Sequence, residues 1–370
     1  MTARTTPDAP RPTTVLIAAG GTGGHLFPAI AVAEAMKRAS GDVRITFVGT
    51  GREVERQIID RAGYPLIELL TKPLKGKSLL YKAGSLALIL PAIISSMLLI
   101  RRLRPALVIG AGGYVSGPFV LAASFTTPTL ILEVNLKPGL TTRWLAPFAG
   151  CVACSFKEST ALFGKKGFHA GHPVRSEFFS LPHIAKRTGA FTVLVIGGSQ
   201  GSRALNRAIL DAAPMRDIHL IHQTGQAQYV EVRDAHVGKG SDAEIVPFID
   251  KMADAFAAAD LIVSRAGAST ISEIAAAGKP AILVPFAAAT DNHQELNARA
   301  MERCGAAVVV TERDAGSLAA RIDELRRDPG RLVAIGVAAR GMANPRAAEE
   351  IADLSFRLIR GDRVTGAAGV

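Results

Sequence analysis

Two segments of this 370-residue chain share one unusual pattern, an uninterrupted apolar stretch that runs into a glycine-rich turn and then into a helix-forming sequence. They are TVLIAAGGTGGHLFPAIAVA at 14–33 and TVLVIGGSQGSRALNRAIL at 192–210. Strands without polar alternation are typical of parallel sheets covered by helices on both faces. A helix that begins after such a turn presents free N–H groups and a partial positive charge, which favour phosphate. The duplication therefore predicts two similar domains, each with an anion-binding turn.

Neither turn has a common nucleotide-binding fingerprint. Gly21-Thr22-Gly23 lacks the third glycine of the dinucleotide motif, and no Lys-Ser or Lys-Thr pair follows either turn as in a Walker A loop. A tight strand–helix turn without a ligand is the alternative for each copy alone. Two copies at equivalent places favour binding.

Buried-strand patterns recur along the chain and alternate with helical ones. We expect strands near 14–19, 43–48, 106–110, 128–133, 151–155, 192–197, 218–222, 244–246, 260–264, 281–284 and 306–310. We expect helices at 28–39, 52–62, 203–212, 269–277, 291–303 and 315–327. This alternation predicts an α/β fold of doubly wound parallel sheets.

A change of composition at 171–191 predicts a linker between the two domains. The expected division is a disordered lead-in (1–13), a first domain (14–178), a second domain (179–345), and a C-terminal helix and tail (346–370) that could pack back on the first domain. Ligands are expected in the cleft between the carboxyl ends of the two sheets. The polar, proline-containing start does not resemble a signal peptide, and three cysteines suit a reducing compartment.

The net charge of +11 lies entirely in the first half of the chain. Residues 72–104 contain no acidic side chain and seven basic ones: Lys72, Lys75, Lys77, Lys82, Arg101, Arg102 and Arg104. They flank the apolar run at 83–100, which is short for a membrane span of about 20 residues and contains Pro91. A core helix is one interpretation. The other is a helix or helix pair, broken near Pro91, whose outer face lies on an anionic membrane surface. The basic residues are not interleaved with aromatic ones, so nucleic acid is not an expected partner.

Several further segments carry a family resemblance: GAGGYVSGP (110–118), LEVNLKPG (132–139), GHPVR (171–175), FIDKM (248–252), SRAGASTISEIAAAGKPAILVPF (264–286) and DNHQELNA (291–298). Together with the two glycine-rich turns, they resemble the MurG family of bacterial peptidoglycan glycosyltransferases. That family transfers N-acetylglucosamine from UDP to undecaprenyl-pyrophosphoryl-N-acetylmuramyl-pentapeptide (lipid I) and forms lipid II. The resemblance implies a GT-B fold, two Rossmann-like domains that face a cleft. It also implies a peripheral enzyme on the cytoplasmic face of the inner membrane, with cell-wall synthesis proteins as further partners.

The donor, UDP-N-acetylglucosamine, is expected on the second domain. Its diphosphate would lie against the turn at 198–201, held by backbone N–H groups, the Ser199 hydroxyl and Arg175. The resemblance implies that Ile249 contacts the base, that Glu273 accepts the ribose hydroxyls and that Gln294 reaches the sugar. The expected donor site comprises Thr22, Gly23, Gly24, Asn135, Arg175, Ser199, Gln200, Ile249, Ala268, Ser269, Thr270, Glu273 and Gln294.

The lipid-linked acceptor is expected on the first domain, beside His25. Its pyrophosphate would be held by Gly21, Thr22, Gly23, Gly112, Gly113 and Tyr114. An imidazole titrates near neutral pH, and a helix N-terminus favours its neutral form, so we expect His25 to act as the general base. The alternative is a helix-start residue that caps the turn. Direct attack by the acceptor hydroxyl would invert the configuration at the sugar carbon, so no covalent intermediate is needed.

The chain lacks the Asp-x-Asp sequence that often holds a catalytic metal in glycosyltransferases, so we predict no metal and no cofactor. Cys151 and Cys154 fall in an expected strand, where they make poor zinc ligands. The chain departs from the family pattern at Leu132, Val134 and His172. Other hypotheses are a glycosyltransferase with another lipid acceptor such as diacylglycerol, a UDP-sugar 2-epimerase, and a non-catalytic membrane scaffold.

Overall fold

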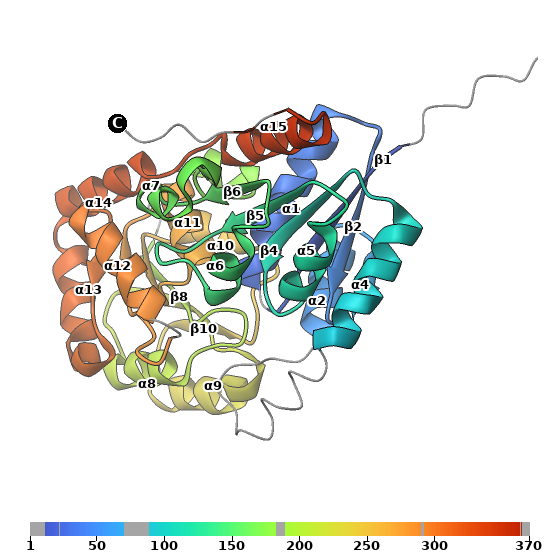
Figure 1. The fold of residues 1–370 in the computed structure, drawn as a ribbon. Helices are drawn as coiled ribbons and strands as arrows, with labels where there is room; N and C mark the ends of the chain where they lie inside the picture. The colour runs from blue at the N-terminus through green and yellow to red at the C-terminus, as the bar shows by residue number, and fades with distance from the viewer. Residues whose placement is uncertain are drawn as a thin grey trace, which may run out of the picture.

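The computed structural model describes residues 12–21, 23–69, 89–182, 189–289, 292–362 and 364. It consists of two α/β domains, drawn mainly from blue to green and from yellow-green to orange in Figure 1. The predicted fold class is confirmed. Each sheet is entirely parallel, with the order β3-β2-β1-β4-β5-β6-β7 in the first domain and β10-β9-β8-β11-β12-β13 in the second.

The strands of the first sheet are β1 (Thr13–Ala19), β2 (Val43–Gly49), β3 (Leu66–Glu68), β4 (Leu107–Gly112), β5 (Thr129–Glu133), β6 (Cys151–Cys154) and β7 (Gly167–His169). The helices described in this domain are α1 (Gly23–Ala39), α2 (Glu53–Arg61), α4 (Ile89–Leu103), α5 (Ser116–Ala123), α6 (Leu140–Leu145) and α7 (Lys157–Thr160), followed by the 3-10 helix η1 (Ala161–Lys166).

The second sheet contains β8 (Phe191–Ile196), β9 (Ile218–Gln223), β10 (Ala243–Val246), β11 (Leu261–Ser264), β12 (Ala281–Leu283) and β13 (Val308–Val309). The helices around it are α8 (Arg203–Ala212), α9 (Tyr229–Gly238), α10 (Met252–Ala258), α11 (Ala268–Ala277), α12 (His293–Arg303), α13 (Leu318–Arg326) and α14 (Pro329–Gly341). Short 3-10 helices are η2 (Ser176–Ser180), η3 (Gln226–Gln228) and η5 (Glu312–Ser317), and the chain continues into α15 (Ala347–Ile359).

The central strands have no polar alternation because both of their faces are buried. On β1, Val15 and Ile17 pack into the core beneath α1, whereas Leu16 and Ala18 pack into the core beneath α5. Strand β8 repeats this division in the second domain. Every strand expected from the sequence is present. The strands β3 and β7 were not expected, because each has three residues and lies at a sheet edge, where no pattern can develop.

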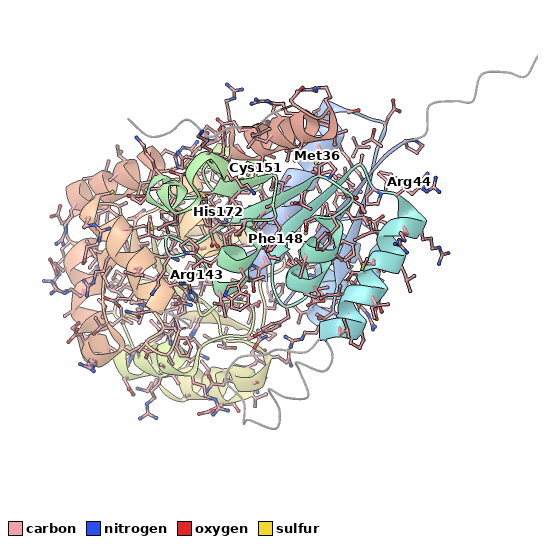
Figure 2. All side chains as sticks on the ribbon, viewed as in Figure 1. Met36, Arg44, Arg143, Phe148, Cys151 and His172 are labelled. Atoms are coloured by element: carbon pink, nitrogen blue, oxygen red, sulfur yellow. The ribbon has the colours of Figure 1, made fainter. Side chains whose placement is uncertain are left out.

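Helix α15 follows the helices of the second domain but packs on the first, beside α1 (Figure 1). Its buried residues include Ile351 and Leu354, and Met36 of α1, labelled in Figure 2, belongs to the same apolar cluster. An ion pair of 3.0 Å joins Arg38 to Glu349. The chain therefore crosses between the domains twice. The crossings touch, because Asn344 Nδ2 donates to the carbonyl oxygen of Ala170 at 2.8 Å.

Helix α4 contains the described part of the apolar run. Pro91 lies in its first turn, where the missing N–H group costs no helical hydrogen bond. One face of α4 packs against α5, and the other leaves Leu90, Ile94 and Leu98 between 50% and 66% exposed. In the part of the chain that the structure describes, none of the helices combines the length and apolar character needed to cross a bilayer. The residues Lys72, Lys75, Lys77 and Lys82 lie outside the described residues, as do residues 1–11 of the expected lead-in.

Candidate active site

A cleft of about 1160 Å³ lies between the two domains and is lined by residues of both. The first domain contributes Gly23 and Gly24 from the start of α1, and the second contributes the turns at 197–203 and 267–270. Ser199, Gln200, Ile249, Glu273, Gln294 and Arg175 also line it. Most of the residues predicted for the donor are therefore brought together, and the cleft is large enough for a nucleotide sugar.

The turn between β8 and α8 can be built only with glycine at its tightest point. Gly201 has a φ of 74°, and a Cβ atom there would collide with the carbonyl oxygen of Thr224. The side chain of Gln223, at the end of β9, donates to the carbonyl oxygen of Gly198 at 2.9 Å. Its oxygen accepts the N–H of Ile249 at 2.8 Å. Gln223 thus connects the glycine-rich turn to the loop expected to bind the base, a role that no sequence motif indicated.

Arg265 is a second residue that the sequence analysis did not assign. Its guanidinium is buried, and it donates to the Ser202 hydroxyl at 2.8 Å and to the carbonyl oxygen of Val284 at 3.0 Å. It also pairs with Glu312 at 2.6 Å. Because Ser202 is the N-cap of α8, Arg265 fixes the end of the glycine-rich turn to the segment that follows β12 in the same domain.

Arg175 and Glu273 face each other in the cleft. Their charged groups are 3.2 Å apart, and Arg175 also pairs with Glu177 at 3.0 Å. The guanidinium lies over the rings of Phe27 and Phe178, 4.9 Å from each centroid, so its plane is held by cation–π contacts. Burial raises the pKa of Glu273 to about 7, although the charge of Arg175 acts in the opposite direction. The cation expected to bind the donor phosphate thus pairs with the carboxylate expected to bind the ribose.

Helices α1 and α11 meet at their N-termini across the cleft. The Ser269 hydroxyl donates to the carbonyl oxygen of Gly24 at 3.1 Å, which connects the two domains directly. At the rim, Arg61 and Asp250 form an exposed ion pair of 2.5 Å between the domains. Such exposed pairs contribute little to stability, so this contact opposes opening of the cleft only weakly. Gln294 lies nearby and accepts the N–H of Phe286 at 2.9 Å.

His25 lies beside the cleft, between the two glycine-rich turns of the first domain. Gly112 and Gly113 have φ values of 105° and 83°. A Cβ atom on Gly112 would collide with the His25 ring, and one on Gly113 would collide with the carbonyl oxygen of Gly20. Burial lowers the pKa of His25, so its imidazole is neutral at pH 7. The side chain of His25 is half-buried. It is not among the residues that line the cleft, although the preceding Gly23 and Gly24 are. Tyr114 is 42% exposed, and Thr22 lies outside the described residues.

Asn135 lies in a loop folded around a buried carboxylate. Oxygen atoms of Glu133 accept the backbone N–H groups of Asn135 and Gly139 at 2.9 and 3.1 Å. Burial raises the pKa of Glu133, and these hydrogen bonds oppose the rise. Asn135 is not among the residues that line the cleft, and its contact with the sugar stays a prediction.

The three departures from the family pattern lie in buried surroundings. Leu132 and Val134 are each 4% exposed, so apolar side chains fit there. The ring of His172 contacts the Ser155 hydroxyl at 3.1 Å, and burial lowers its pKa to about 3. His172 lines a smaller cavity of about 270 Å³, separate from the cleft.

Cys151 and Cys154 are both buried, and burial raises the pKa of their thiols to about 11 and about 12. Thiolates are thus disfavoured at neutral pH, and metal binding through them is disfavoured with them. Across the described ranges, no three His, Cys, Asp or Glu side chains are grouped so that they could hold a metal ion. The absence of a catalytic metal stays a prediction.

Two parallel α/β domains, with a cleft bordered on each side by a glycine-rich turn and a helix N-terminus, form a GT-B fold, the architecture of many glycosyltransferases. Comparisons with known proteins agree with this class. Residues 15–154 match the glycosyltransferase family 28 N-terminal domain, and residues 192–351 match the glycosyltransferase family 28 C-terminal domain.

The most informative relatives carry a specific activity in their names. The UDP-N-acetylglucosamine–N-acetylmuramyl-(pentapeptide) pyrophosphoryl-undecaprenol N-acetylglucosamine transferase of Syntrophus aciditrophicus (strain SB) is 40% identical over 356 residues, 94% of this chain and 99% of the relative. The crystal structure of Acinetobacter baumannii MurG is similar with a TM-score of 0.73 and 29% identity, over 94% of this chain and 100% of that one. The chain belongs to this family of N-acetylglucosamine transferases, MurG, as its motifs predicted.

A likeness to a UDP-N-acetylglucosamine 2-epimerase concerns the fold alone. That structure has a TM-score of 0.65 but only 13% identity, over 94% of this chain and 97% of the other. The two-domain architecture is thus shared with a protein named for a different reaction.

The position of Glu273 predicts an unusual titration. In the ligand-free protein its carboxyl group should titrate near pH 7, because burial disfavours the charged form. Arg175→Gln removes the cation that favours the charged form and should raise this pKa further. Glu177→Gln removes a neighbouring negative charge and should lower it. Carboxyl ¹³C NMR, with Glu273→Gln to assign the signal, measures all three. A wild-type value near 4.5 would contradict the burial of this group.

Proposed function

We infer that this protein transfers N-acetylglucosamine from UDP-N-acetylglucosamine to the muramyl 4-hydroxyl of undecaprenyl-pyrophosphoryl-N-acetylmuramyl-pentapeptide. The products are lipid II and UDP. The near full-length similarity to relatives named for this reaction carries the inference, and the cleft gives it a physical site.

The donor lies on the second domain. Its diphosphate rests on the turn that contains Ser199 and Gln200, at the N-terminus of α8, where backbone N–H groups and the helix dipole stabilise the negative charge that develops on UDP as it leaves. Arg175 supplies a full positive charge from the linker side. When the ribose displaces this guanidinium from Glu273, the carboxylate becomes free to accept the two ribose hydroxyls. The uracil lies against Ile249, whose backbone Gln223 holds in place.

The acceptor lies on the first domain, with its pyrophosphate at the turns that contain Gly21 and Gly113. His25 accepts the proton of the muramyl 4-hydroxyl while that oxygen attacks C1 of the donor sugar. The bond from C1 to the UDP oxygen breaks with its electron pair, so UDP leaves as an anion and the α-linked donor gives a β-linked product. One base is sufficient for this single displacement.

The first domain also provides a face suited to a membrane that carries a lipid-linked acceptor. The exposed residues of α4 form an apolar stripe that ends beside Arg101, Arg102 and Arg104, all exposed. The same domain carries further exposed apolar side chains, since Phe125 after α5 is 69% exposed and Trp144 of α6 is 74% exposed. Apolar side chains beside a cluster of cations match the interface of an anionic bilayer, here the cytoplasmic leaflet of the inner membrane.

Transfer to a defined acceptor is the direct test of the function. Radiolabelled UDP-N-acetylglucosamine incubated with the protein should label lipid I and leave diacylglycerol unlabelled, with no divalent metal required. Incubation with the nucleotide sugar alone should leave it unchanged. If only diacylglycerol is labelled, the inferred acceptor is wrong. If a 2-epimer forms from the nucleotide sugar alone, the protein is an epimerase and the inferred reaction class is wrong.

His25→Ala tests the general base. We expect kcat to fall by about 10²–10⁴-fold, the usual loss when a general base is removed, while the Kd for the donor stays within about twofold. Because burial lowers the pKa of His25, the acid limb of the wild-type kcat profile should lie below pH 6.5. The exposed His169→Ala is a matched control. Near-normal turnover of His25→Ala would direct the search for the base to Glu133 or His293.

The membrane face can be tested apart from the chemistry. Arg101→Glu combined with Arg102→Glu should weaken binding to anionic vesicles by at least about 30-fold, since each basic residue near the surface contributes about 1 kcal/mol and the new carboxylates are repelled. Binding of UDP should not change. Arg216→Glu combined with Arg313→Glu, exposed positions of the second domain, changes the net charge equally. Equal loss of vesicle binding in both double variants would show that only the overall charge matters. No loss in either would indicate that α4 has a purely structural role.

A further inference from the structure

Glu55 is a carboxylate with no exposed surface in the middle of the first domain. It lies on the first turns of α2, below the glycine-rich turn that follows β1, and it is absent from the cleft lining. A buried carboxylate is costly unless its oxygen atoms are hydrogen-bonded. The partners of Glu55 therefore indicate what the residue holds in place.

Both oxygen atoms of Glu55 accept two hydrogen bonds each. Oε1 accepts the backbone N–H of Gly21 at 2.6 Å and the Thr50 hydroxyl at 2.7 Å. Oε2 accepts the backbone N–H groups of Thr50 at 2.8 Å and Gly51 at 3.1 Å. Glu55 thus satisfies donors from two separate turns, the one after β1 and the one after β2. Through these bonds Glu55 connects the first glycine-rich turn to the turn that follows the neighbouring strand β2.

A short series of contacts leads from Glu55 to His25. The bond from Gly21 holds a residue with a φ of 97°, and the preceding Gly20 packs with its carbonyl oxygen against Gly113. Gly112, the neighbour of Gly113, packs against the His25 ring. A Cβ atom on Gly112 or on Gly113 would not fit in these contacts. A displacement of Gly21 would therefore move the surface on which His25 rests.

The corresponding turn of the second domain is held in the opposite way. There the side chains of Gln223 and Arg265 donate hydrogen bonds to the oxygen atoms of Gly198 and Ser202. A stable strand–helix turn thus does not need a buried carboxylate. Of these two turns, only that of the first domain has a buried carboxylate among its described contacts, and it is also the turn beside the expected base and acceptor. We therefore relate Glu55 to these functions.

We propose that Glu55 is a positioning residue, which fixes Gly21 so that His25 and the start of α1 keep the geometry that the acceptor requires. The proposal rests on the inferred role of His25. Glu55 touches neither substrate in this scheme and acts only through the turn. Its loss should therefore reduce turnover and leave the donor site on the other domain intact.

Glu55→Gln separates the two turns. A glutamine keeps most bonds when its oxygen faces the N–H groups of Thr50 and Gly51 and its amide donates to the Thr50 hydroxyl. In that orientation no acceptor remains for the N–H of Gly21. Thr50→Val makes the complementary change, because it removes the hydroxyl and retains the bond to Gly21. Glu53→Gln, an exposed position on the same helix turn, is the charge control.

We expect kcat of Glu55→Gln with lipid I to fall by about 10–100-fold, since a misplacement near 1 Å can cost about 10²-fold. The Kd for UDP should stay within twofold, and amide exchange at Gly21 should accelerate. Thr50→Val and Glu53→Gln should keep kcat within about threefold. A kcat of Glu55→Gln within twofold of wild type, or a parallel loss of kcat and UDP binding, would overturn the proposal.

Failure of the inferred reaction has a different signature. If wild-type protein labels no lipid I, the inferred reaction is wrong whatever the variants do. Amide hydrogen exchange at Gly21 still tests the positioning role in that case, because the measurement needs no substrate. Unchanged exchange in Glu55→Gln would overturn it.

Discussion

Contact between backbones at the carboxyl ends of the strands is the constraint on which this structure depends. In the first domain Gly113 packs against Gly20, and in the second Gly201 and Gly225 pack against Thr224 and Gln200. No side chain fits between these turns, and Gly113, Gly201 and Gly225 adopt positive φ values. Because neighbouring turns touch in this way, the start of the following helix is placed precisely enough to face a phosphate group. The two domains reach the same arrangement from unrelated supporting residues.

The sequence predicted the architecture well because parallel strands buried on both faces leave a strong local signal. Val15 and Leu16 point into different cores, and both must be apolar. The edge strands β3 and β7 leave no such signal, since three residues cannot show a period. The expected C-terminal element illustrates another limit. The sequence predicted a helix there that could pack on the first domain, but it could not identify α1 as the partner, because the contact joins distant parts of the chain.

The site was predictable where the family resemblance assigns a residue to a ligand, and not where a residue acts through a distant partner. Ser199, Glu273 and Arg175 lie in motifs and line the cleft. Arg265 acts on Ser202, 63 positions away, and Gln223 acts on Ile249, 26 positions away. Nothing in either local sequence indicates such a pair. The motifs also did not reveal that Arg175 and Glu273 contact each other. The two ends of the expected donor site therefore depend on one another.

The double crossing of the chain has a mechanical consequence. One connection runs from the first domain past Ala170 to the second, and the other returns through Asn344 to α15. Where they touch, a Cβ atom on Gly171 would lie 2.8 Å from that of Asn344. Two adjacent connections of this kind form an interdomain hinge whose axis runs through both of them. Rotation about the line through them can widen or narrow the cleft, whereas twisting or sliding of one domain over the other would stretch one connection against the other. The position of the two connections thus favours a single direction of movement between the domains, along which the cleft widens or narrows.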